Sequence, residues 1–193
     1  HLTVDSSGIY AEGSTTRLPV DSGRIGALLE LRDNVLPDYA DQINTLTATM
    51  ISEFNAVHRA NQGIDSASTT GLDLFTGTDA DDIAVNAAIV SDPLKLATSA
   101  GGAPGDSGGV KALLALREQP LINGSTLEAY HQGIVGEIGS EAGSAADHDT
   151  SIETVLTQLR NRRDSVNGVS IDEEMANLIR FQQAYNAAAR IIT

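Results

Sequence analysis

The chain has 193 residues, enough for one ordinary domain or for a small domain with helical extensions. Hydrophobic residues make up 41% but aromatic residues only 4%, which favours thin apolar stripes along helices over a wide aromatic core. A formal charge of −14 disfavours nucleic acid, the absence of cysteine excludes disulfides and thiolate metal sites, and no apolar run approaches the ~18 residues that membrane insertion requires.

The first 22 residues read as the end of a β-rich outer domain or as a linker. Short apolar runs separated by Ser, Gly and Thr predict two or three short strands: Leu2 and Val4, Ile9 and Tyr10, Leu18 and Val20. The opening His1-Leu2 is neither an initiator methionine nor the start of a secretory signal. We therefore expect the chain to be an excised or truncated piece of a longer protein.

Residues 23–61 are predicted to form the first long helical segment. A short helical stretch from Arg24 is followed by apolar residues at steps of three and four, which indicate one buried stripe about six turns long. The stripe consists of Leu36, Tyr39, Ile43, Leu46, Met50, Phe54 and Val57. Pro37 lacks a backbone N–H and crowds the preceding turn, so it is expected to end or kink the helix near residues 34–36.

Residues 62–125 are predicted to be an irregular insertion with one short helix. Turn residues dominate it, and two short apolar runs, Leu72–Phe75 and Ile83–Val90, predict a small strand or turn structure packed against the helices. Residues 110–119 have an amphipathic helical pattern that Pro120 should stop.

A second long helix is predicted from about Thr126 to Val166. Its heptad-like stripe consists of Ile134, Ile138, Ala145, His148, Ile152, Val155, Leu159 and Val166. The stripe is weak over one helical turn, at Glu141-Ala142. Four glycines in its first half each cost about 1 kcal/mol relative to alanine, so this end is expected to be loose unless a neighbour packs closely against it: Gly133, Gly136, Gly139 and Gly143.

The final helix has the most regular pattern, and with the previous helix it forms a predicted C-terminal helical pair over residues 126–193. Ser170 with Glu173 suits a capping box, and Asn167-Gly168 supplies the preceding stop. The predicted interface stripe consists of Ile171, Met175, Leu178, Gln182, Tyr185, Ala189 and Ile192. Such spacing indicates docking along another helix: the one ending at Val166, a missing N-terminal helix, or another subunit. The predicted fold is mainly α, with long antiparallel helices in a coiled-coil-like bundle and a small irregular or β segment.

One motif suggests catalysis. Residues 105–109 read Gly-Asp-Ser-Gly-Gly, the string around the nucleophile of trypsin-like serine proteases, which would make Ser107 a hydrolase nucleophile. That chemistry needs a histidine base and a buried aspartate, and in that family both precede the serine. Only His1 and His58 precede Ser107 in this chain, so a glycine-rich turn is the favoured interpretation.

No metal or cofactor site is expected. Four acidic residues, Asp73, Asp79, Asp81 and Asp82, lack the spacing of an EF-hand loop and favour a solvated acidic loop. The histidines at 58, 131 and 148 form no His-Glu-x-x-His pair, which favours roles on helix surfaces or stripe edges. Asn123-Gly124-Ser125 matches a glycosylation sequon, but Asn-Gly is first a turn signal.

Three stretches carry a family resemblance. Residues 165–185, which read SVNGVSIDEEMANLIRFQQAY, resemble the C-terminal signature of flagellar axial proteins, in the form closest to the hook–filament junction family. Residues 26–33 with Leu36-Pro37 and Tyr39 are similar to that family's lead into a long helix, and residues 53–58 to the end of that helix. Together these stretches frame residues 23–193.

The resemblance implies a structural subunit of the bacterial flagellum, exported by the flagellar type III system and located outside the cell, with no catalytic activity. Its implied partners are other copies of itself, hook protein and further hook-associated proteins, and its own N-terminal helices. The resemblance also implies an export chaperone that binds the last helix. The alternatives are a hook or rod relative and, from a different class, a serine hydrolase using Ser107.

Overall fold

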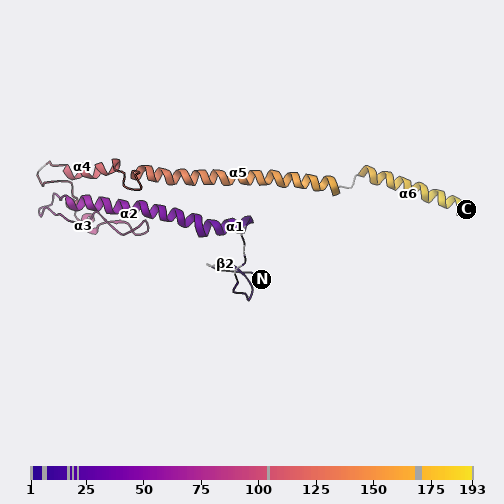
Figure 1. Cartoon of the computed structure of the whole chain (residues 1–193), viewed down its shortest axis with the longest axis horizontal. Coiled ribbons are helices and arrows are strands. Elements are labelled where there is room, and N and C mark those ends of the chain that lie inside the picture. Colours follow the sequence, from indigo (N-terminus) through magenta and orange to yellow (C-terminus); the bar gives the residue numbers. More distant parts are fainter. Residues whose placement is uncertain are drawn as a thin grey trace. The chain divides into compact units, whose positions relative to one another are not determined.

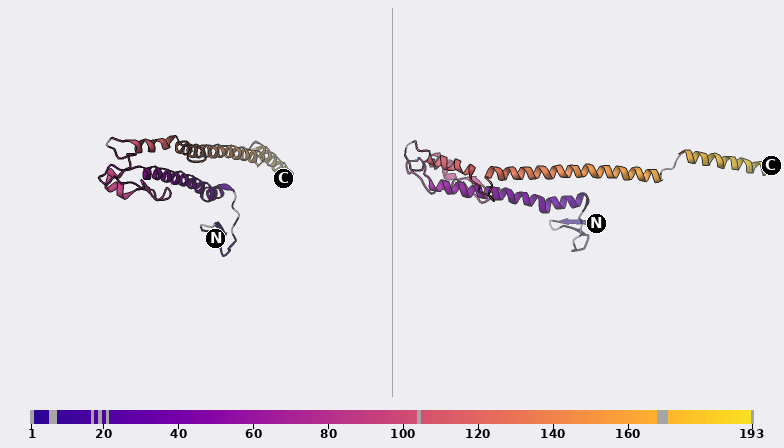
Figure 2. Two further views of the ribbon diagram at one scale, coloured as in Figure 1. Left: turned by 60° about the vertical axis from the view of Figure 1, so that its left-hand side comes forward. Right: turned by 45° about the horizontal axis from the view of Figure 1, so that its top comes forward.

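The computed structural model of the protein describes residues 2–5, 8–16, 18, 20, 22–103, 105–167 and 171–192. Helices dominate this part of the chain, so the predicted mainly α fold is confirmed. The chain divides into two units, His1–Ile138 and Gly139–Thr193. Figures 1 and 2 show the elements of both units coloured in chain order. The four-part division proposed from the sequence stays a prediction.

A short β-hairpin lies near the start of the chain. Strand β1 (Leu2–Asp5) pairs antiparallel with β2 (Gly8–Ala11), with Val4 opposite Ile9. Ile9 is buried, and its carbonyl also accepts a hydrogen bond from the Leu18 N–H at 2.8 Å. Among the described residues, the 1–22 segment therefore contains two of the two or three strands predicted.

The helix that follows contains a wide turn immediately before a proline. α1 (Gly23–Glu30) continues through a π-helical turn, η1 (Leu31–Val35), into α2 (Leu36–Ala60). The Leu36 N–H donates to the Leu31 carbonyl, five residues back. In a regular helix the Pro37 ring would crowd the carbonyl four residues earlier, and widening the preceding turn relieves that contact. The sequence predicted that the helix would end or kink near residues 34–36. The structure has a disturbance at this place, but it is a π-helical turn within one continuous helix.

The buried face of α2 differs from the apolar stripe predicted for it. Leu36 is 54% exposed and Ile43 43% exposed, although both belong to that stripe. The buried residues of α2 are Ile51, Asn55 and His58, which lie one position away from the stripe and include two polar side chains. The other five residues of the predicted stripe are half-buried: Tyr39, Leu46, Met50, Phe54 and Val57. The prediction of one buried stripe is therefore confirmed only in part, because hydrophobic periodicity does not detect positions that are buried through hydrogen bonds.

The insertion folds against α2. Its regular elements are β3 (Phe75–Thr76), β4 (Ala84–Val85), α3 (Ala87–Ser91), η2 (Pro93–Lys95), α4 (Gly108–Ala115) and η3 (Leu116–Glu118). β3 pairs antiparallel with β4, and α2 contacts both β3 and α4. α4 lies beside α2 in Figure 1. The predicted short helix is confirmed, ending in a 3₁₀ turn before Pro120. Leu116 and Ala97, each 2% exposed, belong to the small core of this unit.

The second long helix, α5 (Leu127–Asn167), is confirmed close to its predicted limits. The Thr126 hydroxyl accepts a hydrogen bond from the Ala129 N–H at 3.1 Å and caps its first turn. The helix runs unbroken through Glu141-Ala142, where its predicted stripe is weakest.

The first turns of α5 lie antiparallel to α2. Gln42 Nε2 donates to Glu137 Oε2 at 3.3 Å, while Phe54, further along α2, shares a groove with Leu127 at the start of α5. The contact early in α2 is thus with a later residue of α5, and the contact late in α2 is with the first residue of α5, as in an antiparallel pair. Ile134, on the side of α5 between these two contacts, is only 4% exposed.

Candidate subunit interface

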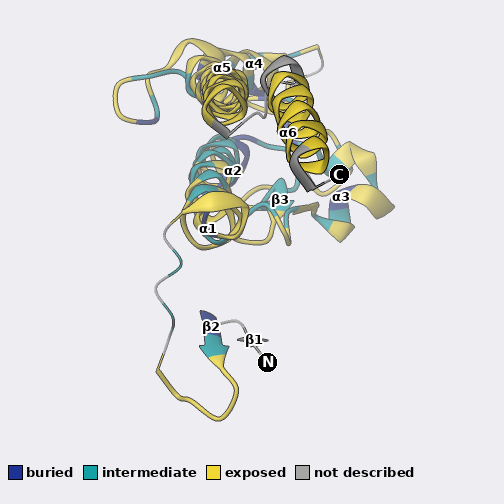
Figure 3. Cartoon of the chain, turned by 90° about the vertical axis from the view of Figure 1, so that its right-hand side faces the viewer, coloured by how far each residue is buried: buried dark blue, intermediate teal, exposed yellow. Residues whose placement is uncertain are grey.

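The last helix, α6 (Ile171–Ile192), carries an uncovered apolar stripe. Five of the seven predicted interface residues have described side chains, and all five are exposed: Met175, Leu178, Gln182, Tyr185 and Ala189. Met175 is 57% exposed, Leu178 55% and Tyr185 76%. In Figure 3 the described part of α6 has the colour of exposed residues. The side chains of Ile171 and Ile192 lie outside the described part of the chain, although both residues belong to the helix.

The predicted caps at the start of α6 cannot be compared with the structure. Gly168 and Ser170 lie outside the described residues, as does the side chain of Glu173. At the other end, Arg190 lies in the last turn, where a cation interacts favourably with the negative end of the helix dipole.

A second uncovered stripe runs along α5 beyond residue 139. Every residue described from 139 to 166 is exposed. The apolar members include Ile152 at 45%, Val155 at 50% and Leu159 at 58% exposure. A helix that leaves such residues in water is marginal by itself, so both stripes are candidate contact surfaces.

The first unit is held together by a polar bracket on α2, formed by Asn55 and His58. The Asn55 side chain donates from Nδ2 to the Phe75 carbonyl at 2.9 Å and accepts from the Phe75 N–H at 2.8 Å. His58 Nδ1 lies 2.6 Å from the Leu72 carbonyl, and the Ala97 N–H donates to His58 Nε2 at 2.9 Å. Two side chains one helical turn apart thereby satisfy four backbone groups of the insertion.

The bracket corrects the role predicted for His58. Its side chain is only 1% exposed, so it is neither on the helix surface nor at the edge of a stripe. Because Nε2 accepts from Ala97, Nδ1 carries the proton and donates to Leu72. The polar bracket was not predicted from the sequence. Its signal is the pair of polar residues Asn55 and His58, three positions apart and directly beside the apolar stripe. His131 and His148 are exposed on α5, as predicted.

Asp106 organises the glycine-rich loop that leads into α4. Its Oδ2 accepts hydrogen bonds from the Ser99 hydroxyl and from the N–H groups of Ala100 and Gly101, each at 2.8 Å. Its Oδ1 accepts from the Gly108 N–H, also at 2.8 Å. These donors, led by the N–H groups of Gly101 and Gly108, lower the pKa of Asp106 to about 2.

The glycines of this motif allow two segments to approach closely. A Cβ at Gly109 would lie 2.3 Å from the Ala97 carbonyl oxygen, and one at Gly108 would lie 2.5 Å from the Ala100 Cβ. Ser107 is exposed, and both ring nitrogens of His58 are already engaged with backbone groups. The Gly-Asp-Ser-Gly-Gly string is therefore a glycine-rich turn, as predicted, whose last two residues begin α4 and pack against residues 97–100.

The acidic loop uses its carboxylates to bind its own backbone. Asp82 Oδ1 accepts from the N–H groups of Thr78 at 2.6 Å and Asp79 at 3.0 Å, and these bonds, Asp79 first, lower its pKa. Asp73 pairs with Arg59 of α2. Across the described part of the chain, no three acidic or histidine side chains come together as a metal site would require.

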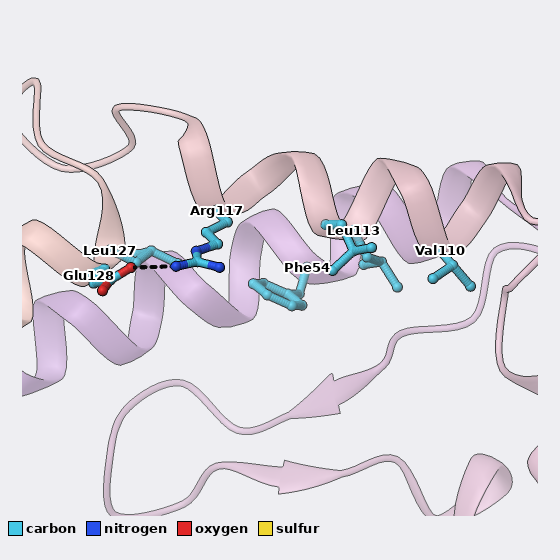
Figure 4. A pocket seen from close by; sticks show the side chains of 7 residues that line it. Phe54, Val110, Leu113, Arg117, Leu127 and Glu128 are labelled. Atoms are coloured by element: carbon cyan, nitrogen blue, oxygen red, sulfur yellow. Dashed lines mark hydrogen bonds and ion pairs between the residues drawn. The ribbon is translucent and has the colours of Figure 1, made fainter.

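An apolar groove of about 370 Å³ lies where α2, α4 and the start of α5 meet (Figure 4). Its lining residues are Phe54, Val110, Leu113, Leu114, Arg117, Leu127 and Glu128. Arg117 and Glu128 form an ion pair at its rim, with Nη2 and Oε2 3.4 Å apart. Besides the stripes on α5 and α6, this groove is a further surface that an apolar side chain of another molecule can enter.

Two further observations concern the rest of the chain. Asn123 and Gly124 both have positive φ angles, and Ile122 and Ser125 exchange backbone hydrogen bonds, so Asn-Gly forms a tight turn, as predicted. None of the helices searched, over the residues that the structure describes, is long and apolar enough to cross a membrane.

Comparison with family models gives two matches. Residues 3–75 match the model described as the helical domain of flagellar hook-associated protein FlgK. Residues 165–193 match the model described as the C-terminal part of the flagellar basal body rod FlgEFG proteins. The two matches include α1, α2 and α6, the elements that carry the polar bracket and the predicted interface stripe.

Several curated proteins are similar in sequence. Flagellar hook-associated protein 1 of Bacillus subtilis (strain 168) is 34% identical over 172 residues, 82% of this chain and 34% of the relative. The protein of that name from Escherichia coli (strain K12) is 34% identical over 139 residues, 63% of this chain and 25% of the relative. The chain thus spans about a third or less of these relatives' lengths. No solved structure matches.

Proposed function

Because this chain belongs to the flagellar hook-associated protein 1 family, we propose that it is the C-terminal part of a structural subunit of the flagellum at the hook–filament junction. The subunit acts through contacts between helices and performs no catalysis. The observation that carries the proposal is the stripe on α6, which is exposed at every described position although its spacing is that of a coiled-coil seam.

The partners follow from the same stripe. Apolar side chains such as Leu178 and Tyr185 gain free energy when they leave water, about 25 cal/mol for each Å² buried. Within the subunit, the proposed occupants are its own N-terminal helices. Between subunits, they are other copies, hook protein and further hook-associated proteins. Before export, a chaperone covers α6, and the flagellar type III system then carries the protein out of the cell.

Charge substitutions in the stripe test the proposal. Met175→Asp and Leu178→Asp, made in the full-length protein, place a carboxylate where the partner helix should pack. Each is expected to weaken chaperone binding by at least about tenfold, equivalent to about 1.4 kcal/mol. Junction assembly should fail, and swimming on soft agar should be lost. Chaperone affinity is measured by calorimetry.

Asn177→Asp is the matched control, because Asn177 is exposed on α6 and lies outside the stripe. It should leave both affinity and swimming unchanged. If Met175→Asp and Leu178→Asp behave like this control, α6 is not the interface and the proposal is wrong.

A hook or rod relative is the second candidate, supported by the rod-protein match over residues 165–193. The match to the hook-associated helical domain over residues 3–75 favours the junction subunit. Electron microscopy of cells lacking the protein separates the two. Loss of the junction subunit should leave hooks without filaments, whereas loss of a hook or rod protein should leave no complete hook.

A serine hydrolase using Ser107 is the candidate from another class. The Ser107 side chain is exposed, but His58 is held by Leu72 and Ala97 and has no free ring nitrogen to serve as a base. A fluorophosphonate probe is expected to leave the protein unlabelled. Labelling that disappears in Ser107→Ala would support the hydrolase.

A further inference from the structure

The turn before Pro37 holds one residue more than a turn of α-helix. In η1 the Leu36 N–H donates to the Leu31 carbonyl, five residues back, where an α-helix would use the carbonyl four residues back. Each residue of an α-helix rotates the chain by about 100°. One extra residue in a single turn therefore rotates the side chains of α1 by about 100° relative to those of α2.

This rotation decides which side chain of α1 lies in line with Leu36. Residues seven positions apart lie on the same face of an α-helix, two turns from each other. In a regular helix Leu29, seven positions before Leu36, would be in line with it. Because η1 takes up one extra residue, Leu28 has that place instead, eight positions before Leu36 in the sequence.

Exposure agrees with this arrangement. Leu28 is 56% exposed and Leu36 is 54% exposed, whereas Leu29 is half-buried. Leu28 thus shares the exposed side of the helix with Leu36, and Leu29 faces another way.

The sequence pattern fits the regular orientation of α1 better than the observed one. Positions spaced by four and three continue the stripe of α2 towards the start of α1: Ile25, Leu29, Arg32, Leu36, Tyr39 and Ile43. A regular helix would place all of them on one face. In the structure, the rotation of α1 takes Ile25 and Leu29 out of line, so the stripe ends at Leu36.

Pro37 is the cause of the extra residue. Its ring would crowd the Asp33 carbonyl in a regular helix, and it has no N–H to bond that carbonyl. The hydrogen bond from Asn34 Nδ2 to Glu30 Oε2, at 2.8 Å, joins side chains four residues apart, a spacing that a regular helix serves equally well. Since π-helical turns are rare, a regular helix is the expected form once the proline is replaced.

We propose that Pro37 holds α1 in this rotated orientation and thereby ends the apolar stripe of α2 at Leu36. Pro37 is a positioning residue that acts through the turn at 31–35. The inference concerns the first unit alone and is independent of α6 and of the junction role. A partner that needs the stripe to continue to Ile25 must rotate α1, and it can do so only by as much as its affinities for the two orientations differ.

Chemical cross-linking within one helix tests the proposal, and the natural chain has no cysteine to interfere. Leu28→Cys and Leu29→Cys are each combined with Leu36→Cys. Both variants are treated, at low protein concentration, with a rigid bis-alkylating biphenyl reagent that spans two helical turns, about 11 Å. Mass spectrometry measures the rate of linking within the chain. The 28–36 pair should link at least about ten times faster than the 29–36 pair, and Pro37→Ala should reverse this order.

Leu36→Cys with Ile43→Cys is the matched control, because these positions are seven apart within regular α2. This pair should link at the same rate with and without Pro37→Ala, since alanine is a strong helix former. Faster linking of the 29–36 pair in the natural chain, or an unchanged order in Pro37→Ala, would overturn the proposal. Slower linking of all three pairs in Pro37→Ala would also overturn it, because Pro37 would then support the helix itself and not the orientation of α1.

Discussion

At the scale of single residues, the fold of the first unit depends on His58. The side chain is 1% exposed and joins α2 to two separate segments of the insertion, at Leu72 and Ala97. His58→Ala would leave the half-buried Leu72 carbonyl and the buried Ala97 N–H without these partners and would open a cavity. Because each buried unsatisfied group costs about 1–3 kcal/mol, the free energy of unfolding should fall by about 2–4 kcal/mol, measured by urea denaturation.

His131→Ala is the matched control, because His131 is exposed on α5. Its effect on the free energy of unfolding should stay within about 0.5 kcal/mol. Equal urea midpoints for the two variants would show that the bracket does not stabilise the unit.

Asp106 makes the stability of the same unit depend on pH. Its pKa in the folded protein is about 2, below the ordinary value of 3.8 that it takes in the unfolded chain. Its hydrogen bonds therefore stabilise the fold fully above about pH 4, and this stabilisation is lost as the pH falls through 2. Asp106→Asn should lower the melting temperature at pH 6, and the difference from the natural chain should shrink between pH 4 and 2.

Asp149→Asn, on the exposed face of α5, is the control for Asp106 and should change the melting temperature little at either pH. Asp65 and Asp82 also have lowered pKa values, Asp65 through its bonds from Thr69, and both remain in every variant. A difference between Asp106→Asn and the natural chain that stays constant down to pH 2 would contradict the assignment.

At the scale of elements, the glycines of α5 are open positions. A Cβ at Gly133, Gly136, Gly139 or Gly143 would have nothing within 4 Å in the described chain. Replacing Gly139 and Gly143 with alanine should therefore raise the stability of this part of α5 by about 1 kcal/mol each, seen as slower amide hydrogen exchange. Gly109→Ala should instead destabilise the protein, because its Cβ would collide with the Ala97 carbonyl oxygen. Slower amide hydrogen exchange in Gly109→Ala, as well as in the Gly139 and Gly143 variants, would contradict this distinction.

The sequence predicted where the helices lie better than what they bury. The limits of α5 and α6, the short helix α4 and the disturbance before Pro37 all follow from apolar spacing, caps and proline. The buried face of α2 does not, because Asn55 and His58 bury themselves through backbone hydrogen bonds that leave no hydrophobic period. Loop 99–108 was likewise predicted only as a turn, since nothing in its sequence shows that Asp106 collects four donors.

At the scale of the whole molecule, the chain combines a unit that has its own core with a unit whose described residues are all exposed. His58, Asp106 and Leu116 are all in the first unit, so its stability should not depend on α6. The candidate interface on α6, unlike the first unit, depends on a surface outside its own unit. Its stripe could be predicted from the sequence because it is one continuous helix with regular spacing, but its occupant could not, because that depends on a second surface.

Truncation after Asn167 tests this separation. Removing the last 26 residues should leave the urea midpoint of the first unit unchanged, because the buried residues of that unit, such as His58 and Leu116, all belong to its own 138 residues. The helical signal in circular dichroism should fall by the contribution of the 22 residues of α6. A lower midpoint, measured through the Phe54–Phe75 contact by near-ultraviolet circular dichroism, would show that α6 supports the first unit.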